Sequence, residues 1–542
     1  MLPEARSYDE LAGKFAWDIP ERFNIGVAVC DHWAEREPDR EALVFVNEDG
    51  DTARYSYADL RRLSNQLANL LVSRGVQPGD RVGVLLPQRL ETAFAHIAAL
   101  KIGAITIPLF TLFGEEALEF RLHNSGAKAV VTDATGAAKL EKIRDRLPEL
   151  TTVFCVDGED GGAQDLASNM AGHEDTFQAF DTAADDPAII IYTSGTTGQP
   201  KGALHGHRVL LGHLPGVEMS HDFLGQTGDR IWTPADWAWI GGLLDVLMPS
   251  LYLGVPVVAC RFRKFTAEAA FQLLQDQKIR NTFLPPTALK MMRQLSNPQD
   301  LWQLDLRSVA SGGETLGAEL IDWGRRTFGL TINEFYGQTE CNMIVSSCST
   351  LMEARPGIMG RAIPGHDVTI VNDAGKELPV ETLGNIAVKR PDPVMFLGYW
   401  NNPEATAKKF AGDWLLTGDT GLRDEDGWLH FVGRDDDVIT SSGYRIGPGE
   451  IEDCLIKHPA VAMAGVVGKP DEQRTEIVKA YIVLKDGASA SESLAREIAA
   501  FVKTRLAAHE YPREVTFVDA LPLTTTGKVI RRELRARAEE ET

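Results

Sequence analysis

The sequence predicts an α/β protein: a large N-terminal domain of several subdomains with layered α/β sheets, and a small mobile α+β C-terminal lid domain. Three observations lead to this prediction. The 542 residues exceed what one hydrophobic core accommodates. Helix-type and strand-type segments alternate along most of the chain, which is typical of α/β layers. A segment rich in Gly and Asp then separates a final stretch with its own pattern. We expect domains at 1–434 and 435–542.

The alternation is clearest near the N-terminus. Asp59–Gly75 has apolar residues at helical spacing and ends in glycine, which predicts a helix. The apolar, β-branched run Asp80–Pro87 predicts a buried strand. The pattern repeats with a helix through Glu91–Ile102 and a strand at Ile105–Pro108, so we expect largely parallel sheets. Asp157–Ser168, rich in Gly and Asp, is expected to be a surface loop.

The expected domain boundary lies in Gly433–Gly449 (GRDDDVITSSGYRIGPG). Three consecutive aspartates do not fit a core and three glycines follow, so we expect a mobile connection; a plain solubilising charge run is the alternative. The elements expected after it are a helix at Ile451–Lys457, strands at Val461–Gly468 and Lys479–Leu484, a helix at Leu494–Leu506 and a strand at Val515–Val518.

Composition limits the function classes. Formal charge is 55 − 77 = −22, which argues against a nucleic-acid-binding surface. The six cysteines form no C-x-x-C pair, so reduced, structural cysteines are expected rather than a zinc site. The N-terminal residues lack a basic region followed by an apolar run, and no stretch approaches the ~20 apolar residues of a membrane span. We therefore expect a cytoplasmic protein without integral membrane contact.

The most informative segment is Ile189–Gly202, IIIYTSGTTGQPKG. A β-branched strand leads into a loop dense in Gly, Ser and Thr that ends in Lys201. Glycines let backbone N–H groups turn toward an anion, hydroxyls add donors, and lysine adds a charge. The Walker A pattern is absent. Composition alone leaves two interpretations, a phosphate-binding loop and a plain flexible turn.

The complete string TSGTTGQPKG resembles the phosphate-binding loop of the acyl-adenylate-forming superfamily, which includes AMP-dependent acyl-CoA synthetases, luciferases and the adenylation domains of peptide synthetases. Four further motifs follow in the order of that family. They are SGGET at Ser311–Thr315, NEFYGQTE at Asn333–Glu340, LTGD at Leu416–Asp419, and PLTTTGKVIRR at Pro522–Arg532. The resemblance extends from about Tyr55 to Arg532.

The resemblance implies an ATP/AMP site. The implied nucleotide-binding residues are Thr193, Ser194, Gly195, Thr196, Thr197, Gly198, Gly313, Glu314, Thr315, Tyr336, Gly337, Gln338, Asp419, Arg434 and Arg445. Within this set, Tyr336 would face adenine and Asp419, with Arg434, would hold the ribose. The implied catalytic residues are Lys528, Thr339, Glu340 and Lys201, and Glu340 would also bind Mg²⁺, which needs few protein carboxylates.

The reaction implied by the resemblance is carboxylic acid + ATP + CoA to acyl-CoA + AMP + pyrophosphate, through an acyl-AMP. ATP, Mg²⁺ and coenzyme A are the expected cofactor and substrates. The small domain would rotate about Asp436 between the half-reactions, and Gly443 and Tyr444 would line the coenzyme A tunnel. A lysine on a Gly/Thr loop is usually solvated, but the frame around Lys528 matches the family's active-site lysine.

The acyl pocket is expected at Trp239, Ile240, Gly241 and Gly337. Trp239 resembles the family's aromatic gate, although a core tryptophan is the alternative. Acetate-specific relatives carry tryptophan where this chain has Gly337, so the resemblance favours a short- to medium-chain acid. Gly241 and Gly242 would widen the pocket or serve tight backbone packing. No lysine or arginine stands in these walls, which argues against a dicarboxylate.

Three alternatives remain open. An aryl-CoA ligase, benzoate-like, fits glycine-lined walls. An amino-acid-adenylating enzyme would use Asp236 for the substrate amine, but no carrier-protein motif follows Lys528. A nucleotide-binding regulator would not need the complete set of catalytic residues.

Lys528 stands in a loop of the kind that lysine acetyltransferases modify in related synthetases, and acetylation would remove its charge. A homo-oligomer is also left open.

Overall fold

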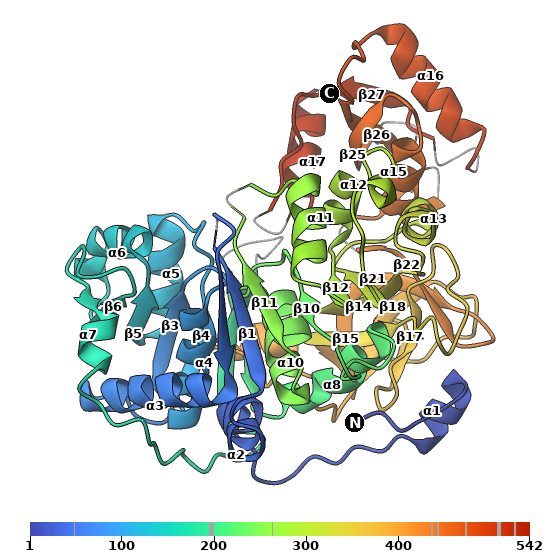
Figure 1. Cartoon of the computed structure of the whole chain (residues 1–542). Helices are drawn as coiled ribbons and strands as arrows, with labels where there is room; N and C mark the ends of the chain where they lie inside the picture. Colours follow the sequence, from blue (N-terminus) through green and yellow to red (C-terminus); the bar gives the residue numbers. More distant parts are fainter. Residues whose placement is uncertain are drawn as a thin grey trace.

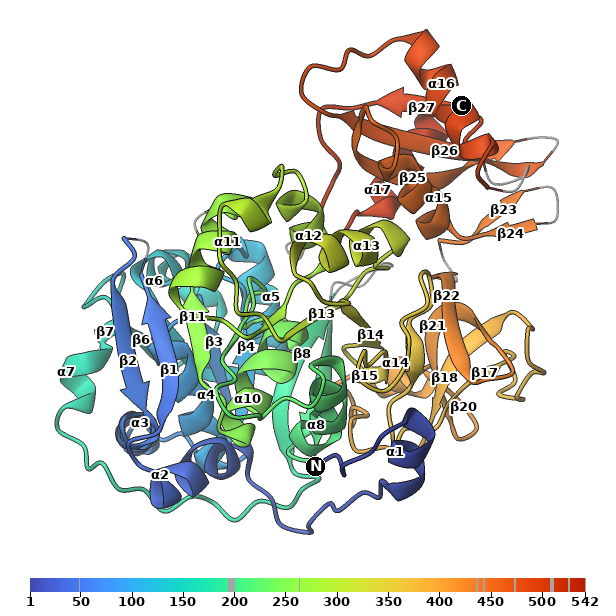
Figure 2. The same ribbon diagram turned by 45° about the vertical axis from the view of Figure 1, so that its right-hand side comes forward.

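Mixed α/β layers organise the chain, as Figure 1 shows. The computed structural model describes all residues except 48, 194–199, 263, 435–436, 442–443, 472–473, 507–510, 525–526 and 542, and it leaves out the side chains of 440, 444, 445 and 450. Within the described residues, the strands form three sheets, of 14, 8 and 5 strands. The two larger sheets belong to the N-terminal part, and the small sheet stands apart from them (Figure 2).

The largest sheet has a parallel half and an antiparallel half. Its strand order is β17 (Val368–Val371), β18 (Gly384–Lys389), β21 (Trp414–Arg423), β22 (Trp428–Arg434), β16 (Gly360–Ala362), β15 (Cys341–Ser346), β14 (Asn333–Gln338), β13 (Ser308–Gly312), β12 (Asn281–Phe283), β10 (Ile231–Trp232), β11 (Val257–Cys260), β1 (Glu41–Val46) and β2 (Thr52–Ser56), with β20 (Phe410–Ala411) on β21. Pairing from β1 through β11, β10, β12 and β13 to β14 is parallel; from β14 through β15 to β17 it is antiparallel.

The second sheet carries the hairpin of the expected phosphate loop. Its order is β19 (Gly398–Tyr399), β9 (Lys201–Gly206), β8 (Pro187–Thr193), β4 (Ile105–Pro108), β3 (Arg81–Leu85), β5 (Ala127–Thr132), β6 (Thr152–Cys155) and β7 (Gln164–Asp165). The strands from β8 to β7 are parallel, whereas β9 is antiparallel to β8 and β19. The β8 residues are almost all buried and rich in isoleucine, as expected for a strand covered on both faces.

The small sheet belongs to the C-terminal part. Its order is β24 (Tyr444–Ile446), β23 (Ile439–Ser441), β26 (Thr475–Leu484) and β25 (Val461–Asp471), with β27 (Glu514–Phe517) parallel to β26. The β25–β26 pair is a long antiparallel hairpin whose central residues are buried. This sheet has its own apolar cluster, which includes Ile451, Val466 and Ile498. A separate C-terminal domain is thereby confirmed, while the boundary at 434/435 falls on residues outside the described set and stays a prediction.

Helices pack against the faces of the sheets. The α-helices are α1 (Tyr8–Lys14), α2 (His32–Arg36), α3 (Tyr57–Ser73), α4 (Leu90–Ile102), α5 (Glu115–Ser125), α6 (Ala134–Glu141), α7 (Leu166–Met170), α8 (Val209–Ser220), α9 (Ile240–Gly242), α10 (Met248–Leu253), α11 (Ala267–Asp276), α12 (Pro286–Met292), α13 (Ala318–Thr327), α14 (Pro403–Ala407), α15 (Pro448–Ile456), α16 (Glu492–Lys503) and α17 (Arg531–Glu540). Short 3₁₀ turns occupy η2 (Arg144–Arg146) and η4 (Pro298–Asp300), and π-type turns η1 (Val27–Asp31) and η3 (Leu243–Leu247).

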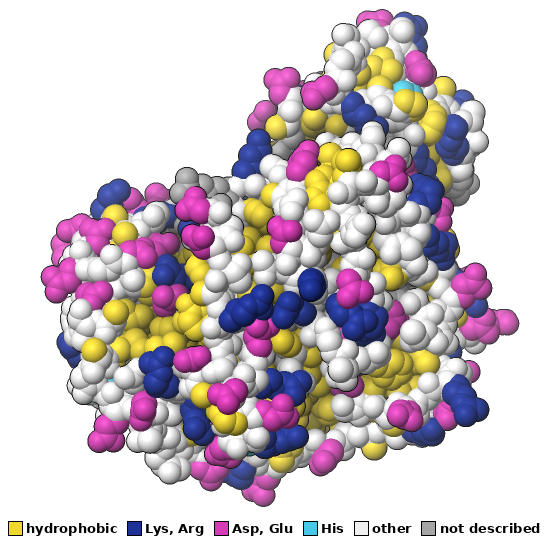
Figure 3. Space-filling view, viewed as in Figure 1, with side chains coloured by type: hydrophobic (Ala, Val, Ile, Leu, Met, Phe, Trp, Pro, Cys, Tyr) yellow, Lys and Arg dark blue, Asp and Glu magenta, His cyan; other side chains and the backbone are white. Residues whose placement is uncertain are grey.

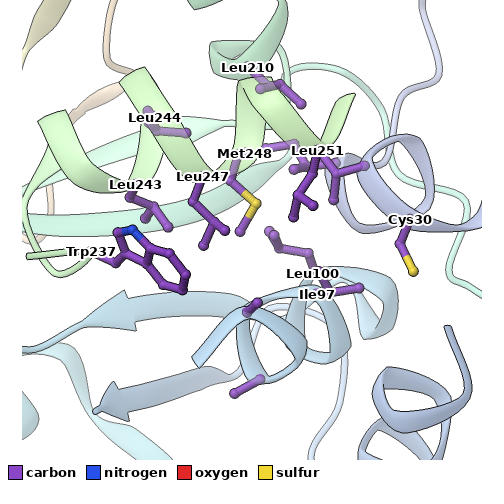
Figure 4. Packing of buried hydrophobic residues seen from close by; sticks show 14 of the residues in the cluster. Cys30, Ile97, Leu100, Leu210, Trp237, Leu243, Leu244, Leu247, Met248 and Leu251 are labelled. Carbon is purple, nitrogen blue, oxygen red and sulfur yellow. The ribbon is translucent and has the colours of Figure 1, made fainter. Parts of the chain in front are cut away.

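The main core lies where α4, α8 and the continuous helical stretch α9–η3–α10 meet. Figure 4 shows Leu243, Leu247, Met248 and Leu251 pointing across to Ile97 and Leu100 of α4, with Trp237 beside them. Each of these side chains is fully buried. A buried leucine or isoleucine contributes roughly 1.5–3 kcal/mol relative to exposure, so this layer holds the two large sheets together.

Helix α8 is buried on every side, and small residues allow it to sit that close to its neighbours. A Cβ atom at Gly212 would lie 2.5 Å from the backbone nitrogen of Val394. At Gly216 it would lie 2.7 Å from Cβ of Met343 on β15. Because these neighbours include backbone atoms, they cannot move aside cheaply. Gly216 therefore sets the distance between α8 and β15, and Gly212 sets the distance between α8 and the segment that carries Val394.

The outer surface carries charges of both signs. On the face shown in Figure 3, acidic and basic side chains are interspersed, with apolar side chains between them. All six cysteines are free and buried, as the sequence predicted. In the part of the chain that the structure describes, no helix is long and apolar enough to cross a membrane.

The structure corrects three sequence-based expectations. Residues 157–168 are not all loop, because β7 and the first residues of α7 lie within them. The segment 433–449 is not merely a connection: it contains the end of β22, both β23 and β24, and the start of α15. Largely parallel sheets describe only half of the molecule, because short connections after β14 favour antiparallel pairing. Helix α17 was not foreseen.

Replacing Gly212 with alanine should destabilise the protein by about 1–3 kcal/mol, because the new methyl group overpacks against the Val394 backbone. Thermal unfolding measures the effect. Gly13→Ala in α1 is the matched control, since nothing lies within 4 Å of its Cβ position. Equal unfolding temperatures for the two variants would contradict this account of α8.

Candidate functional site

The hairpin between β8 and β9 holds the ends of the expected phosphate loop. Thr193 and Lys201 are register partners at its loop end, and Thr193 Oγ1 donates to the carbonyl oxygen of Lys201 at 3.4 Å. The residues between them that the sequence nominated, Ser194, Gly195, Thr196, Thr197 and Gly198, are outside the described set. The Nζ atom of Lys201 lies 5.2 Å from the ring centroid of Tyr399 on β19. The lysine thus stands beside the loop it terminates.

Asp419 on β21 is the centre of a hydrogen-bonded group. The Tyr336 hydroxyl donates to its Oδ2 at 2.6 Å, and Gln338 Nε2 donates to the same oxygen at 3.2 Å. Arg434, its register partner on β22, has a guanidinium nitrogen 3.8 Å from Oδ1. Three segments distant in sequence are therefore brought together.

Burial dominates the electrostatics of this group. It raises the pKa of Asp419 above its usual value, while the nearby Arg434 cation opposes the shift. Burial and then the Asp419 carboxylate raise the pKa of Tyr336 well above its ordinary range, so the phenol is a hydrogen donor at neutral pH. Lys409, which the motif analysis missed, donates to Gln338 Oε1 at 3.0 Å and to the Thr417 carbonyl at 3.1 Å. It fixes the amide orientation of Gln338.

Glu340 lies in the turn between β14 and β15, next to the partly exposed Thr339. Its carboxylate Oε1 accepts a short hydrogen bond from the Tyr399 hydroxyl, and its carbonyl accepts one from the Phe396 N–H at 2.8 Å. Tyr399 is buried and also lies under the Lys201 ammonium. One tyrosine therefore connects the two groups that the sequence assigned to metal and phosphate charge.

The donor set around Glu340 suits a nucleotide-bound Mg²⁺. Among the described residues, no three His, Cys, Asp or Glu side chains gather into a metal site. Mg²⁺ needs no such cluster, because it keeps several waters and phosphate oxygens and takes one or two carboxylates from the protein. A single buried carboxylate held in place by a tyrosine hydroxyl fits that chemistry.

Lys528 comes from the C-terminal domain and reaches the N-terminal one. Its Nζ lies 5.9 Å from the ring centroid of Trp239, and its Cε lies 3.8 Å from the Cβ position of Gly313. Burial lowers the pKa of Lys528, while Glu314 and Asp419 oppose that shift. The half-buried ammonium therefore stands in the field of two carboxylates from the nucleotide motifs.

The loop that carries Lys528 is anchored to α12. The Thr287 hydroxyl donates to Glu314 Oε1 at 2.7 Å and lies 3.4 Å from the Gly527 carbonyl. Lys290 of the same helix has its Nζ 3.6 Å from Glu314. No motif of the sequence pointed to Thr287 or Lys290, because their role depends on the arrangement of the two domains.

Trp239 lies in an aromatic wall. Its ring centroid is 5.8 Å from that of Phe283, which in turn is 5.1 Å from that of Phe335. Gly241 and Gly313 let the indole lie flat against the backbone: their Cβ positions would be 2.8 Å and 3.1 Å from ring atoms. Gly241 therefore serves close packing of the tryptophan, one of the two interpretations left open. Ile240 beside it is buried in the main core.

Gly337 does not open free volume, contrary to the expectation. A Cβ atom there would lie 2.3 Å from the Met343 nitrogen and 2.6 Å from the Asn342 Cα. The β14–β15 register shifts at this point, so the two backbones approach too closely for a side chain. Gly242 is similar, with a Cβ position 2.2 Å from the Asp236 carbonyl oxygen. Backbone packing explains both glycines.

Several nominated residues are not placed in the site. Asp436 and Gly443 are outside the described residues, and for Tyr444 and Arg445 only the backbone, in β24, is described. Thr315 faces Gly449 at the domain junction, where the Cβ position of Gly449 is 3.6 Å from its Oγ1. Asp437, the third aspartate of the run, pairs with Arg531 and Arg535 of α17 at 3.5 and 3.1 Å. It is therefore not a plain solubilising charge.

Asp236, the residue that an amino-acid substrate would need, is engaged elsewhere. Its Oδ1 accepts a hydrogen bond from the Ala238 N–H at 2.8 Å. Burial raises the pKa of this carboxyl to about 6. The group is therefore part of its own loop, which favours an acid without an α-amine.

The junction between the domains contains two buried carboxyl groups. Asp453 on α15 approaches Gly317 so closely that a Cβ there would lie 2.7 Å from Oδ2. Burial raises the pKa of Asp453 to about 7, and burial together with Asp453 raises the pKa of Glu334 to about 8. A small hollow lies here, lined in part by Lys290, Asp453 and Lys457. It lies outside the nucleotide motifs and so is not the acyl pocket.

A lysine of the small C-terminal domain thus meets a hydrogen-bonded polar group on the large α/β domain. The chain belongs to the family described as AMP-binding enzyme: that family's model matches residues 30–400, and the model of the AMP-binding enzyme C-terminal domain matches 450–528.

Relatives and solved structures agree with this assignment. The chain is 36% identical over 554 residues to the acetyl-coenzyme A synthetase of Bacillus subtilis, covering 98% of this chain and 95% of the relative. It is also 36% identical to the human mitochondrial acyl-coenzyme A synthetase ACSM1, covering 96% and 92%. A Brucella canis acyl-CoA synthetase structure is 34% identical with a TM-score of 0.76, covering 99% and 100%.

A structure of the anthranilate CoA ligase AuaEII in complex with anthranoyl-AMP has a TM-score of 0.87 at 28% identity, covering 96% of this chain and 98% of that one. The predicted fold class is confirmed by these similarities. The chain is an AMP-forming acyl-CoA synthetase, with ATP and coenzyme A as substrates and Mg²⁺ as the partner of ATP.

Tyr399→Phe should weaken the response to Mg²⁺ by about tenfold or more, because it frees the Glu340 carboxylate that the hydroxyl holds. Mn²⁺ titration in the presence of ATP, followed by electron paramagnetic resonance, measures binding without turnover. Tyr57→Phe, which loses a similarly buried hydroxyl bonded to the Leu251 carbonyl, is the control. Unchanged Mn²⁺ affinity in Tyr399→Phe would contradict the positioning role.

As pH rises, wild type should lose stability that Asp453→Asn keeps, because the asparagine side chain does not ionise. The pKa of Asp453 is raised to about 7, so its favourable neutral form is present at low pH and lost between about pH 4 and 7. Four charged groups also shift this pKa: Lys290 and Glu319 of the large domain, Glu452 of α15, and Lys457, which follows that helix.

The expected difference in unfolding temperature between Asp453→Asn and wild type grows by roughly 2–4 °C from pH 5 to 8. Differential scanning calorimetry at both pH values measures it. The exposed Asp519→Asn serves as control. A difference that is independent of pH would show that Asp453 keeps an ordinary carboxyl pKa in the folded protein.

Proposed function

We propose that the chain activates a short- to medium-chain carboxylic acid, and that the residues around Lys528 and Asp419 form the adenylation site. The observation that carries this proposal is the meeting of Lys528, Trp239 and the Asp419 group, which come from segments far apart in the sequence. The substrate carboxylate and ATP are both anions, so their reaction requires a cation at the site. The Lys528 ammonium, held near Glu314 and Asp419, supplies that cation.

The hydrogen-bonded group around Asp419 would bind the nucleotide. Asp419 and Arg434 would hold the ribose hydroxyls, and Tyr336 would present its ring to adenine. Gly313, with a φ of +93°, turns the backbone of the motif at Gly313–Thr315 toward the base. The loop from Thr193 to Lys201, with its N–H and hydroxyl groups, would receive the β- and γ-phosphates.

In the first half-reaction, a carboxylate oxygen of the acid attacks the α-phosphorus of ATP and pyrophosphate leaves. Both reactants are anions, so the site must cancel charge and align the attack. Lys528 would lie beside the reacting carboxylate and α-phosphate, Lys201 beside the departing phosphates, and Thr339 would donate its hydroxyl to the α-phosphate. When bound through Glu340, Mg²⁺ would neutralise phosphate charge, and Tyr399 would orient that carboxylate.

In the second half-reaction, the thiol of coenzyme A attacks the acyl carbon and AMP leaves. Lys528 would have to withdraw for the thiol to enter, which requires movement about Asp436. Gly443 and Tyr444 would then line the thiol channel, and Arg445 would contact phosphate. These roles rest on the family resemblance of residues at and beside the junction.

The acid would lie between Trp239 and Gly241 on one side and Gly337 on the other, over Phe283 and Phe335. Apolar and aromatic walls suit an uncharged acyl group. An aryl acid is the second candidate, supported by the similarity to the anthranilate CoA ligase structure. An amino acid is disfavoured by the engagement of Asp236 with its own loop.

The proposal extends to the cellular setting. A cytoplasmic location is part of the proposal. Acetylation of Lys528 by a lysine acetyltransferase would stop adenylation, and the half-buried position of the residue implies that modification takes place when the domains are apart. Self-association into a homo-oligomer is part of the same proposal.

The experiment is pyrophosphate release across a panel of carboxylic acids, with and without coenzyme A, for wild type and Lys528→Ala. The variant should lose about 10²–10³-fold in adenylation, since it lacks the cation that stabilises the developing charge. It should still convert supplied acyl-AMP and coenzyme A to the thioester. Exposed Lys485→Ala is the control. Equal loss of both half-reactions would contradict the role of Lys528.

A further inference from the structure

Three polar side chains are buried together where η3, β15 and α8 meet. They are Asp245, Asn342 and His213, with 3%, 5% and 0% of their surfaces exposed. Asn342 Nδ2 donates to Asp245 Oδ1 at 2.7 Å, and His213 Nε2 lies 3.8 Å from the same oxygen. The mechanism proposed above uses none of these residues.

The hydrogen-bonding state of His213 follows from its other ring nitrogen. Nδ1 lies 2.7 Å from the Val209 carbonyl, and only an N–H can donate to a carbonyl, so Nδ1 carries the proton. Burial lowers the pKa of this imidazole to about 4, which keeps it neutral near pH 7. Nε2 is then a lone-pair acceptor, and it has no hydrogen-bond partner among the described residues.

An unpaired acceptor in this position is costly. Leu243, Leu244 and Leu247, the neighbours of Asp245 on η3, belong to the main apolar core (Figure 4). Leaving a buried polar atom unsatisfied costs about 1–3 kcal/mol. Native proteins accept that cost rarely, and usually where a ligand or an ordered water completes the set. The missing partner of His213 must be a hydrogen donor.

The three residues lie between the two walls assigned to the acyl group. Asp245 follows Trp239 and Ile240 on the same continuous helical stretch. Asn342 is adjacent to the other wall, since its Oδ1 is 2.7 Å from the Cβ position of Gly337. The Asp245–Asn342 hydrogen bond thus ties one acyl wall to the other, and His213 faces that bond from α8.

We propose that the far end of the acyl pocket accepts a hydrogen-bond donor, and that the substrate class is a carboxylic acid bearing a hydroxyl group. The hydroxyl donates to His213 Nε2 and lies within reach of the Asp245–Asn342 pair. This inference rests on the proposed function, because it places the acid between the walls named there. His213 is a specificity-determining residue in this scheme.

Other substituents fit the same groups less well. A second carboxylate would meet the Asp245 carboxyl and an acceptor nitrogen with no cation beside them. Burial raises the pKa of Asp245 well above its usual value, which makes the group a poor counter-charge for an ammonium substituent. At 3.8 Å from His213 Nε2, its carboxyl oxygen is too far away to complete the hydrogen bonding of that nitrogen. A methyl end would leave His213 Nε2 unpaired. A neutral donor, the hydroxyl, is what remains.

The test compares pairs of acids that differ only by one hydroxyl, both aliphatic and aromatic, with the hydroxyl at successive positions. Pyrophosphate release gives kcat/KM for each acid. For at least one pair, wild type should prefer the hydroxy acid by about tenfold or more, since sites built to bond a hydroxyl reject analogues that lack it. His213→Phe should abolish that preference mainly by slowing the hydroxy acid.

His213→Gln supplies the conservative control, because its amide oxygen can still accept and should keep part of the preference even if His213→Phe fails to fold. His221→Gln, at another buried histidine whose Nδ1 lies 3.0 Å from Ser308 Oγ, should leave the preference unchanged. If wild type prefers the unsubstituted acid in every pair, the proposal is overturned. A buried water would then be the hydrogen-bond donor to His213 Nε2. No release with any acid would instead overturn the proposed function itself.

Discussion

The structure depends on bringing one ammonium group from the small domain against the nucleotide motifs of the large one. Lys528 reaches Trp239, and its charge is compensated by Glu314 and Asp419. Without these carboxylates, a cation partly removed from water would be unfavourable. Gly313, which lies opposite the Lys528 side chain, and Thr287, which lies beside Gly527, let the two segments approach each other. The elements between these residues hold the two halves of one site in register.

This arrangement explains why the surrounding groups are tied together so tightly. Tyr336 and Gln338 both hold Asp419 through one oxygen, while Tyr399 holds Glu340 and lies below Lys201. Because these polar groups are already in position, they need little reorientation when two anions react. Preorganisation of this kind lowers the free-energy barrier of the reaction. At the domain junction, burial favours the neutral forms of Asp453 and Glu334 over their charged forms.

Much of this was predictable from the sequence, because the chemistry is carried by contiguous motifs. The helix at α4, the strand at β4 and the hairpin around Thr193 and Lys201 follow from local pattern. Tyr399 and Lys409 did not, since their partners lie far away in the chain and no short pattern marks them. Gly337 was misinterpreted because a missing side chain looks like free volume until the backbone of Met343 is seen beside it. The grouping of His213 with Asp245 and Asn342 likewise has no local sequence signal, because only the fold brings these residues together.

The central claim, an acyl-AMP formed by attack of the carboxylate on the α-phosphorus, has a direct test. The enzyme is incubated with ATP, coenzyme A and an accepted acid labelled with ¹⁸O in both carboxylate oxygens, and AMP and pyrophosphate are examined by mass spectrometry. The account predicts one ¹⁸O atom in each AMP and none in pyrophosphate, because the bridging oxygen of the acyl-AMP stays with phosphorus when the thiol attacks. Unlabelled AMP, or label in pyrophosphate, would contradict it.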